Sequence, residues 1–327
     1  MMMMKALKDI FFADLLILGD SFFFRYLEGE KESVVKVPVV YRDEVIRIRD
    51  EVIDIARTRK ENEFFYSNMN IPYRVAVIHT ISGTGYFLRR LKLPVPVLDT
   101  LGFRDSVLST LKSLGKSRGL ILVAGATGSG KSTTIYSLLT NYLSVHGDVV
   151  LSVEDPPELP VQGGYFDRGI WYQVDANAVG GYDKAMISAM RYNPRYIFLG
   201  EIRSSLSARE AIRAAVNGHL VVTTIHGNSL QGAIYALQQI ALGSNSDIDL
   251  VRSILGDGLL AVLHQELMFT SVGTRKLQAE LLYVGGIPGI TSKIRSGKLE
   301  LLNNDIDTQN ILLNKGINLY AHYSNGK

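Results

Sequence analysis

From about residue 119 onward, short apolar runs alternate with longer amphipathic segments. The apolar runs are GLILVA, DVVLSVE, YIFLGE and LVVTTI. They are too short for ordinary helices and rich in β-branched residues, which is typical of buried strands. The segments between them, such as KSTTIYSLLTNYL and SAREAIRAAVNG, are typical of helices. This alternation predicts an α/β domain with a parallel sheet covered on both faces, which binds ligands at the carboxyl ends of its strands.

The preceding part of the chain has a mixed pattern. Its strand-like runs are residues 11–18, 33–41 and 73–81. Between them, residues 42–57 carry apolar side chains at helical spacing among charges, which predicts an amphipathic surface helix. The pattern therefore predicts a smaller α+β domain. Pro94 and Pro96 favour an extended linker after it, so we place the domain boundary near residue 98, with domains 1–98 and 99–327.

Two further segments give less regular patterns. The segment LVRSILGDGLLAVLHQEL, residues 250–267, predicts a helix; a hairpin over 269–284 and a polar helical tail follow it. The apolar segment at 9–24 is interrupted by aspartates, so it predicts a buried strand rather than a membrane span, which needs about 20 apolar residues.

Composition and charge exclude some classes of site. The chain contains no cysteine, which excludes disulfides and cysteine-ligated zinc and favours an intracellular protein. The net charge of +3, with a pI near 8.8, is too small to indicate a nucleic-acid or membrane-surface partner by itself.

A phosphate-binding loop follows the strand GLILVA directly. The residues GATGSGKS fit the pattern G-x-x-x-x-G-K-[ST] and run into a predicted helix. The glycines let successive backbone N–H groups point at phosphate, and the helix N-terminus adds partial positive charge. In this loop Lys131 is expected to neutralise the β- and γ-phosphates of ATP, and Ser132 to ligate Mg²⁺. The predicted nucleotide-binding residues are Gly125, Ala126, Thr127, Gly128, Ser129, Gly130, Lys131, Ser132 and Thr133.

Acidic residues end two of the other predicted strands. The segment VEDPPEL places Asp155 and Glu158 after one strand, where a carboxylate can orient the attacking water or bind magnesium through water. The alternative is a solvated acidic patch. The strand YIFLGE ends in Glu201, which is expected at the magnesium side of the site. Arg203 follows two residues later and has an equally good alternative as an ion-pair partner of Glu201.

Two of the six histidines flank one strand. His219 precedes LVVTTI and His226 follows it, so the two imidazoles are expected about 20 Å apart and on opposite faces. They are therefore not expected to bind one metal ion or one phosphate together. Both could simply be polar residues at strand ends, but the neighbouring motifs favour a role for one of them.

The order of these four motifs resembles the secretion ATPase family, the hexameric motors of type II and type IV secretion, conjugation and type IV pili. The resemblance covers roughly residues 119–228 and implies a RecA-like P-loop domain preceded by a PAS-like domain. By this resemblance, Glu158 is the catalytic carboxylate and Glu201 the Walker B glutamate. His226 would sense the γ-phosphate, and His219 would serve packing or inter-domain contact.

The resemblance also implies arginines that reach the nucleotide from the N-terminal domain or a neighbouring subunit. Arg74 and Arg89 match the segments that supply them, and Arg90 is a rival to Arg89. The alternative is that these arginines only extend from strand ends into solvent. The predicted catalytic residues are thus Lys131, Glu158, Glu201, His226, Arg74 and Arg89, and the predicted magnesium ligands are Ser132, Glu201 and Asp155.

Departures from the family pattern narrow the expected function. The four-cysteine motif of the assembly and export motors is absent, and Asn193-Pro194-Arg195 resembles the Dot/Icm and conjugative branch. We therefore expect a cytoplasmic Mg²⁺-dependent ATPase, a homo-hexamer that works on inner-membrane platform proteins, without a direct nucleic-acid partner. Pilus retraction, a RecA-like nucleic-acid translocase and a scaffold that binds ATP without turnover are the alternatives.

Overall fold

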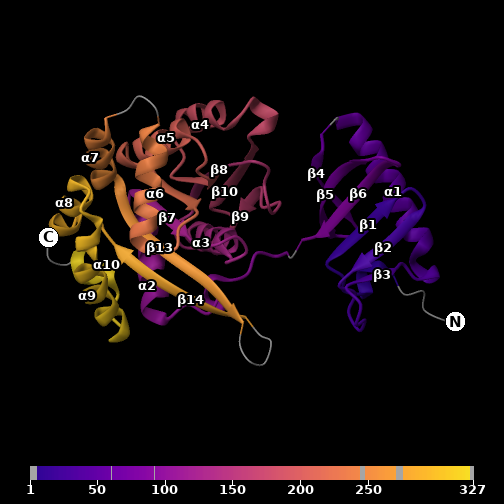
Figure 1. Ribbon diagram of the computed structural model, residues 1–327, viewed down its shortest axis with the longest axis horizontal. Helices are drawn as coiled ribbons and strands as arrows, with labels where there is room; N and C mark the ends of the chain where they lie inside the picture. The colour runs from indigo at the N-terminus through magenta and orange to yellow at the C-terminus, as the bar shows by residue number, and fades with distance from the viewer. Residues whose placement is uncertain (1–5, 60, 92, 244–246, 270–274, 325–327) are drawn as a thin grey trace. The chain divides into compact units, whose positions relative to one another are not determined.

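The computed structural model describes residues 6–59, 61–91, 93–243, 247–269 and 275–324. The chain divides into two compact units. One comprises the chain up to Pro94 together with Glu158–Pro160, and the other comprises Val95–Pro157 and the chain from Val161 on (Figure 1).

The first unit is a six-stranded antiparallel sheet with one long helix. The strand order is β3-β2-β1-β6-β5-β4. The elements are β1 Asp14–Leu18, β2 Ser21–Arg25, β3 Val34–Lys36, α1 Val39–Arg59, β4 Glu63–Asn68, β5 Ile71–Thr80 and β6 Gly83–Arg90, after a short 3₁₀ turn at Leu7–Asp9.

The core of this unit lies between α1 and one face of the sheet. Phe24, Leu15, Leu88 and Val75 are paired across four neighbouring strands, so they share a face, and all are fully buried. On α1, Val45, Ile48 and Val52 recur at helical spacing and are also fully buried. The helix predicted for residues 42–57 is therefore confirmed.

Two predictions for this unit were wrong in detail. The segment 33–41 forms only a three-residue strand, β3, because α1 already begins at Val39. Pro38 lies just before the helix, where its fixed φ and missing N–H are tolerated. The segment 9–24 contains two strands, β1 and β2, which pair as a hairpin around Gly19 and Asp20.

The second unit contains an eight-stranded mixed sheet, in the order β14-β13-β7-β12-β11-β8-β10-β9. The neighbours from β13 to β10 pair in parallel, and the outer strands β14 and β9 pair antiparallel. The strands are β7 Gly119–Ala124, β8 Asp148–Glu154, β9 Gly163–Tyr165, β10 Gly169–Asp175, β11 Tyr196–Glu201, β12 Leu220–Ile225, β13 Leu259–Phe269 and β14 Arg275–Tyr283.

Helices cover both faces of this sheet. They are α2 Asp105–Ser113, α3 Lys131–His146, α4 Tyr182–Arg191, α5 Ser205–Val216, α6 Leu230–Leu242, α7 Ile248–Gly258, α8 Pro288–Ser296, α9 Asn303–Asn314 and α10 Leu319–Ser324, with 3₁₀ turns at Leu98–Thr100, Leu114–Lys116, Asn177–Val179 and Leu299–Leu302. On one face, Tyr136 and Tyr142 of α3 pack against Phe198 and Tyr196 of β11. On the other, residues of α4, α5 and α6 share a core with alternate residues of β7, β11 and β12. The predicted α/β architecture is confirmed.

The helix predicted over residues 250–267 was wrong in its second half. The helix α7 ends at Gly258, and the following LLAVLHQELMF is β13, which pairs in parallel with β7. A continuous apolar run does not by itself distinguish a buried strand from a buried helix. The hairpin predicted next is confirmed as the pair β13–β14, and its turn at 270–274 lies outside the described residues.

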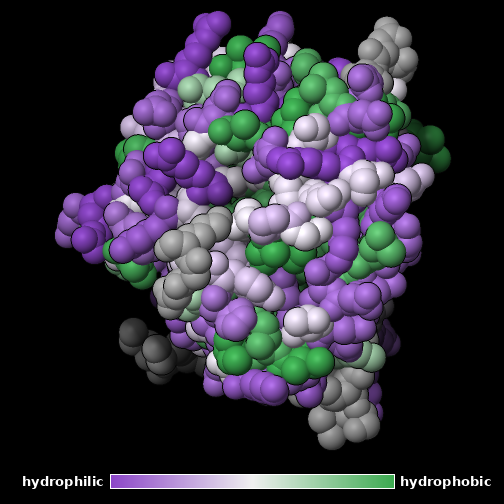
Figure 2. All heavy atoms as spheres, turned by 90° about the vertical axis from the view of Figure 1, so that its left-hand side faces the viewer, coloured by the Kyte–Doolittle hydropathy of each residue, from purple (hydrophilic) through white to green (hydrophobic). Residues whose placement is uncertain are grey.

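The face formed by the last helices is largely polar. Hydrophobic side chains appear there in separate patches among hydrophilic ones (Figure 2). Leu250, Leu301 and Ile311 are among the exposed hydrophobic residues of this part of the chain. Within the described segments, no helix combines the length and apolarity that a membrane crossing demands.

Candidate functional site

The phosphate loop joins β7 to α3 at the carboxyl end of β7. Residues 125–130 form the loop, and α3 begins at Lys131 directly after Gly130, whose φ is +87°. The ammonium group of Lys131 donates hydrogen bonds to the carbonyl oxygens of Gly125 (2.8 Å) and Ala126 (2.9 Å), so the loop curls around its own lysine. Ser132 and Thr133 lie in the first turn of α3, as predicted.

The loop leaves room for a ligand on one side and none on the other. A Cβ atom added to Gly128 would meet nothing within 4 Å. One added to Gly125 would lie 2.3 Å from the carbonyl oxygen of Gln265 on β13. The open side contains the helix N-terminus, whose unpaired N–H groups favour an anion. The loop therefore fits a phosphate, which can replace the two carbonyl oxygens as the partner of Lys131.

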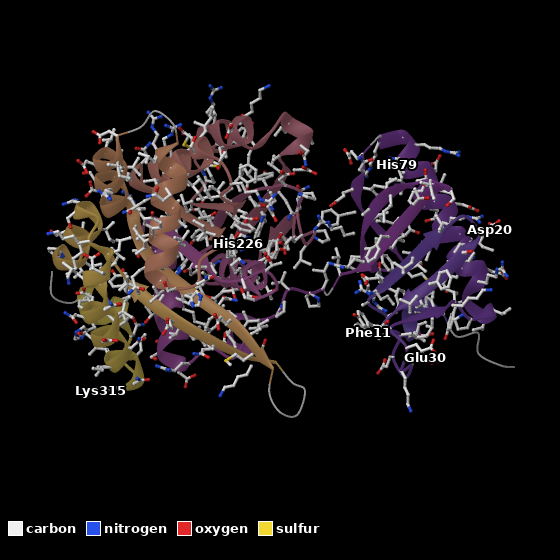
Figure 3. The ribbon with its side chains drawn as sticks, in the orientation of Figure 1. Phe11, Asp20, Glu30, His79, His226 and Lys315 are labelled. Atoms are coloured by element: carbon white, nitrogen blue, oxygen red, sulfur yellow. The ribbon has the colours of Figure 1, made fainter. Side chains whose placement is uncertain are left out.

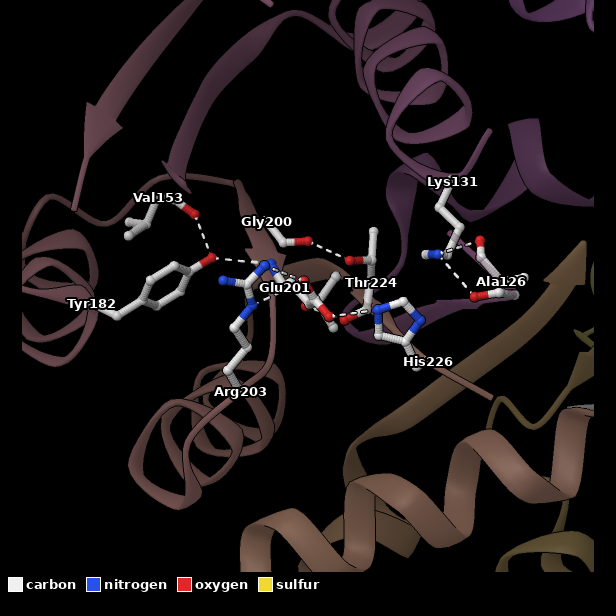
Figure 4. Close-up of polar contacts among 11 residues, drawn as sticks. Ala126, Lys131, Val153, Tyr182, Gly200, Glu201, Arg203, Thr224 and His226 are labelled. Carbon is white, nitrogen blue, oxygen red and sulfur yellow. Dashed lines mark hydrogen bonds and ion pairs between the residues drawn. The ribbon is translucent and has the colours of Figure 1, made fainter. Parts of the chain in front are cut away.

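Glu201 and His226 lie together at the carboxyl ends of adjacent strands β11 and β12. The Nε2 atom of His226 is 3.0 Å from Oε1 of Glu201. Arg203 holds the other oxygen, with Nε and Nη2 at 3.0 and 2.7 Å from Oε2 (Figure 4). Glu201 is about three-quarters buried, whereas the His226 imidazole is 57% exposed and so accessible to a ligand (Figure 3). The ion pair predicted between Glu201 and Arg203 is present.

Tyr182 and Gly200 position Glu201. The Tyr182 hydroxyl donates to the carbonyl of Val153 (2.8 Å) and accepts from the backbone N–H of Glu201 (3.2 Å), linking β8 to β11. Burial raises the pKa of Tyr182 far above its usual range, so the hydroxyl stays protonated. Gly200 forms a bulge in the pairing of β11 with β12, and a Cβ there would lie 3.2 Å from the Tyr182 hydroxyl. Glycine thus lets β11 approach Tyr182 closely.

The acidic segment after β8 contains carboxylates in two environments. Glu154 is buried and accepts hydrogen bonds from Tyr136 and from Gln173 (2.9 Å), so it supports the sheet. Asp155 and Glu158 are exposed in the loop between β8 and β9, and Asp155 accepts a hydrogen bond from Asn177. Both follow the carboxyl end of β8 in the chain, and their place in the site stays a prediction.

The predicted magnesium ligands do not form a preassembled carboxylate cage. In the parts of the chain that the structure describes, no three His, Asp or Glu side chains are arranged to hold a metal ion. Ser132 supplies a hydroxyl at the start of α3, and Glu201 a carboxylate at the end of β11. Mg²⁺ typically binds through one or two protein oxygens, substrate phosphates and water, so this sparse donor set fits that ion together with a nucleotide.

The three candidate arginines lie on neighbouring strands of the first unit. Arg74 and Arg89 are paired across β5 and β6, so they share a face of the sheet. Arg74 forms an ion pair with Glu63, and Arg89 one with the buried Asp14 (3.1 Å). Arg90 follows Arg89 on an extended strand and so points to the opposite face, where it donates to the carbonyl of Ile10.

His219 lies at the other end of β12 from His226. Its Nδ1 atom is 2.7 Å from the carbonyl oxygen of Pro194, just before β11. The contact ties together the beginnings of two adjacent strands. The separation of the two histidines expected from the sequence is therefore present, and His219 has a packing contact.

The chain matches a family model described as Type II/IV secretion system protein over residues 59–280, more than half of its length. It belongs to that family. The resemblance seen in the four motifs is thus confirmed. The competence protein ComGA of Bacillus subtilis (strain 168) is 32% identical to this secretion system protein over 195 residues, 58% of this chain and 53% of ComGA. The chain therefore spans about half the length of ComGA.

Solved structures show the same fold. The pilus retraction motor PilT with bound ADP matches with a TM-score of 0.76 and 25% identity over 91% of this chain and 86% of PilT. The Legionella pneumophila ATPase DotB matches with a TM-score of 0.71 and 20% identity over 89% of this chain and 83% of DotB. The secretion system protein thus has a RecA-like P-loop domain preceded by a smaller α+β domain.

Sequence reasoning missed two residues that shape the site of this secretion system protein. Tyr182 is the first residue of α4, and nothing in the sequence around it indicates a link to β11. Gln265 lies in the segment expected to be helical, which hid its place beside the phosphate loop. Recognising LLAVLHQEL as a strand parallel to β7 would have revealed the second residue.

Proposed function

We propose that this chain is a Mg²⁺-dependent ATPase, one subunit of a homo-hexameric motor that powers a type IV secretion or conjugal transfer apparatus. The observation that carries the proposal is the position of Lys131, whose ammonium group lies within a glycine loop at the carboxyl edge of the sheet. The Glu201–His226 pair lies at the same edge, two and one strands away from β7. A loop that fits phosphate and two polar side chains thus lie at the same edge of the sheet.

The residues of this edge have separate parts in hydrolysis. Lys131 exchanges its carbonyl partners for the β- and γ-phosphates, and the N-terminal N–H groups of α3 bind the same charge. Glu158 accepts the proton of the attacking water. His226, which is exposed and has Nε2 3.0 Å from Oε1 of Glu201, contacts the γ-phosphate, and Glu201 orients the imidazole. Ser132 and Glu201 would hold Mg²⁺, which would supply positive charge to offset that of the phosphates.

Membership of the secretion family supports the assignment as a motor. The segment Asn193-Pro194-Arg195, which resembles the Dot/Icm and conjugative branch, supports a role in secretion or conjugation. We propose that the motor acts in the cytoplasm and associates peripherally with the inner membrane through platform proteins. Nucleic acid is not proposed as a direct partner.

Pilus retraction is the second candidate. PilT is a pilus retraction motor, and its structural similarity covers nine-tenths of this chain at 25% identity. A gene deletion separates the two candidates. Deletion of the gene should abolish transfer or secretion in its host under the first proposal, and should leave pili extended under the second.

The first test is steady-state Mg²⁺-ATPase activity per chain as a function of protein concentration. A steep rise is expected if a neighbouring subunit completes the site. Appreciable activity that does not depend on concentration would contradict the shared site. An absence of ATP turnover from the assembled wild-type protein would contradict the ATPase and favour a nucleotide-dependent scaffold.

Mixing two inactive variants tests Arg89 directly. Lys131→Ala lacks the phosphate-binding lysine, and Arg89→Ala lacks the arginine proposed to act on a neighbour's nucleotide. In randomly mixed rings at equal amounts, about a quarter of the sites combine both intact residues, so activity should return. Arg90→Ala, with its side chain on the opposite sheet face, is the matched control and should retain activity by itself.

A nucleic-acid translocase is distinguished by adding DNA. Stimulation of the ATPase activity by single- or double-stranded DNA that decreases steeply as salt rises would contradict the secretion motor and favour a nucleic-acid translocase. We expect no stimulation.

A further inference from the structure

Strand β13 extends past the end of β7 and runs beside the phosphate loop. Its register pairs Leu263 with Val123 and His264 with Ala124, so Gln265 is the next residue along, beside Gly125. The closeness is direct, because a Cβ on Gly125 would lie 2.3 Å from the Gln265 carbonyl oxygen. The backbone of β13 therefore forms one wall of the loop.

The side chain of Gln265 also contacts the loop. It is only 1% exposed, and its Nε2 donates a 2.7 Å hydrogen bond to the carbonyl oxygen of Ser129, 136 residues earlier in the chain. The Oε1 atom is buried and has no hydrogen-bond partner among the described residues. A buried Oε1 without a partner costs free energy, so the carboxamide of Gln265 stabilises the loop through its Nε2 donor.

This hydrogen bond fixes the orientation of one peptide group. In a trans peptide the C=O and the following N–H point in opposite directions. When Gln265 holds the Ser129 carbonyl toward β13, the N–H of Gly130 points away from β13, toward the open side of the loop. That N–H stands at the N-terminus of α3, among the donors available to a phosphate.

We propose that Gln265 is a positioning residue of the nucleotide site: through the carbonyl of Ser129, it holds the Gly130 N–H in the orientation that binds a phosphate of the nucleotide. The inference rests on the proposed nucleotide binding and goes beyond it, because Gln265 belongs to none of the four motifs that indicate the family. It adds to the site a residue of a strand that begins 128 residues after Lys131.

The competing explanation is that Gln265 only fills space in the core. Gln309 provides a matched control, since it is fully buried and its Nε2 donates to the carbonyl of Tyr283 (2.8 Å), on the other side of β13 from β7. Its Oε1 also accepts from the Tyr283 N–H (2.8 Å). Gln309→Leu therefore removes a comparable buried donor without touching the loop.

The experiment measures calorimetric Kd values for ATP and for inorganic tripolyphosphate, with melting temperatures, on full-length protein. Gln265→Leu should weaken both ligands about ten-fold, because both use the same phosphate donors, and it should raise KM for ATP more than it lowers kcat. Gln309→Leu should lower the melting temperature at least as much but leave both Kd values unchanged. Equal Kd values for folded Gln265→Leu and wild type would overturn the inference.

A second variant keeps the inference testable if Gln265→Leu does not fold. In Gln265→Glu, a protonated carboxyl group can donate to the Ser129 carbonyl, whereas a carboxylate cannot. ATP affinity relative to wild type should therefore fall as pH rises through the pKa of the new carboxyl group. A pH-independent ratio would reject the role of Gln265. If the wild-type protein itself binds neither ligand, the proposed function fails.

Discussion

The two edges of one parallel sheet use charged residues differently. At the carboxyl edge, Lys131 is hydrogen-bonded to loop carbonyls, and His226 lies 3.0 Å from Glu201. A bound nucleotide can replace or supplement these partners. At the amino edge, His219 is bonded to the carbonyl of Pro194, and Arg195 to that of Gly115 (3.3 Å). The same side-chain chemistry is thus proposed to serve a ligand at one edge, and it holds the chain's own turns at the other.

The amino edge is not lacking in charge or space. A pocket of about 460 Å³ opens there, lined among others by Lys116, Arg118, Asp148, Arg195, Asn217 and His219. The helices α3, α4 and α5 end at this edge, where cations offset the partial negative charge of helix C-termini. Position along the strand, rather than residue type, therefore distinguishes the proposed reactive histidine from the structural one.

The largest expected effect is that of Lys131→Ala. Loss of the ammonium group should reduce kcat/KM for ATP by at least about 100-fold, because a cation that stabilises phosphoryl charge is removed. Lys116→Ala, at the amino edge, should leave turnover unchanged. Equal losses in the two variants would erase the distinction between the edges.

Glu158→Gln should separate binding from turnover. The glutamine cannot accept a proton, so kcat should fall by about 10²- to 10⁴-fold while the Kd for ATP stays near the wild-type value. Asp148→Asn at the amino edge should preserve both quantities, since the amide oxygen can still accept from the Val149 N–H. Wild-type turnover in Glu158→Gln would show that another group is the base.

The two histidines compare the edges within one strand. His226→Ala should lower kcat by about 10- to 100-fold, the worth of a hydrogen bond to a charged group. His219→Ala should leave kcat near wild type and reduce the free energy of unfolding by about 1 kcal/mol through loss of its bond to Pro194. Steady-state kinetics and urea unfolding of both variants test this. A larger loss of kcat in His219→Ala than in His226→Ala would contradict the comparison.

The smallest effect concerns stability and pH at the amino edge. Burial, together with Lys116, Arg195 and Arg168, lowers the pKa of His146 below 6.5. The unfolded chain therefore binds a proton at this residue more readily than the folded chain, so His146 makes stability fall as pH drops below about 6.5 and level off below its folded pKa. His146→Gln should make the urea midpoint less sensitive to pH over this range. An unchanged pH dependence would contradict this role.

Sequence patterns predicted those parts of the molecule whose information is local. The strands β7, β8, β11 and β12 were recognisable because each is a short apolar run bounded by a turn, and the phosphate loop because its glycines and lysine lie within eight consecutive residues. The rule that parallel strands share a carboxyl edge placed Glu201 and His226 at one edge of the sheet, but their contact is known only from the structure. The orientation of Arg89 and Arg90 followed only when the register of β6 was known.

Contacts between residues far apart in the chain could not be predicted from the sequence. The run LLAVLHQEL fits a buried helix or a buried strand equally well, and only its pairing with β7 decides the matter. With the wrong element, Gln265 could not be placed beside Ser129. Tyr182 was missed for a related reason, because its partners Val153 and Glu201 lie on two other strands.

The close approach of Gln265 to Gly125 gives a steric reason for the first glycine of the nucleotide-binding signature. The strand β13, and no ligand, occupies the space that a side chain at residue 125 would need, whereas the space beside Gly128 is open. Both glycines of the signature, Gly125 and Gly130, therefore face β13, whereas Gly128, at a variable position of the signature, faces open space. A side chain at residue 125 would therefore require β13 to move, which ties the geometry of the loop to that of its flanking strand.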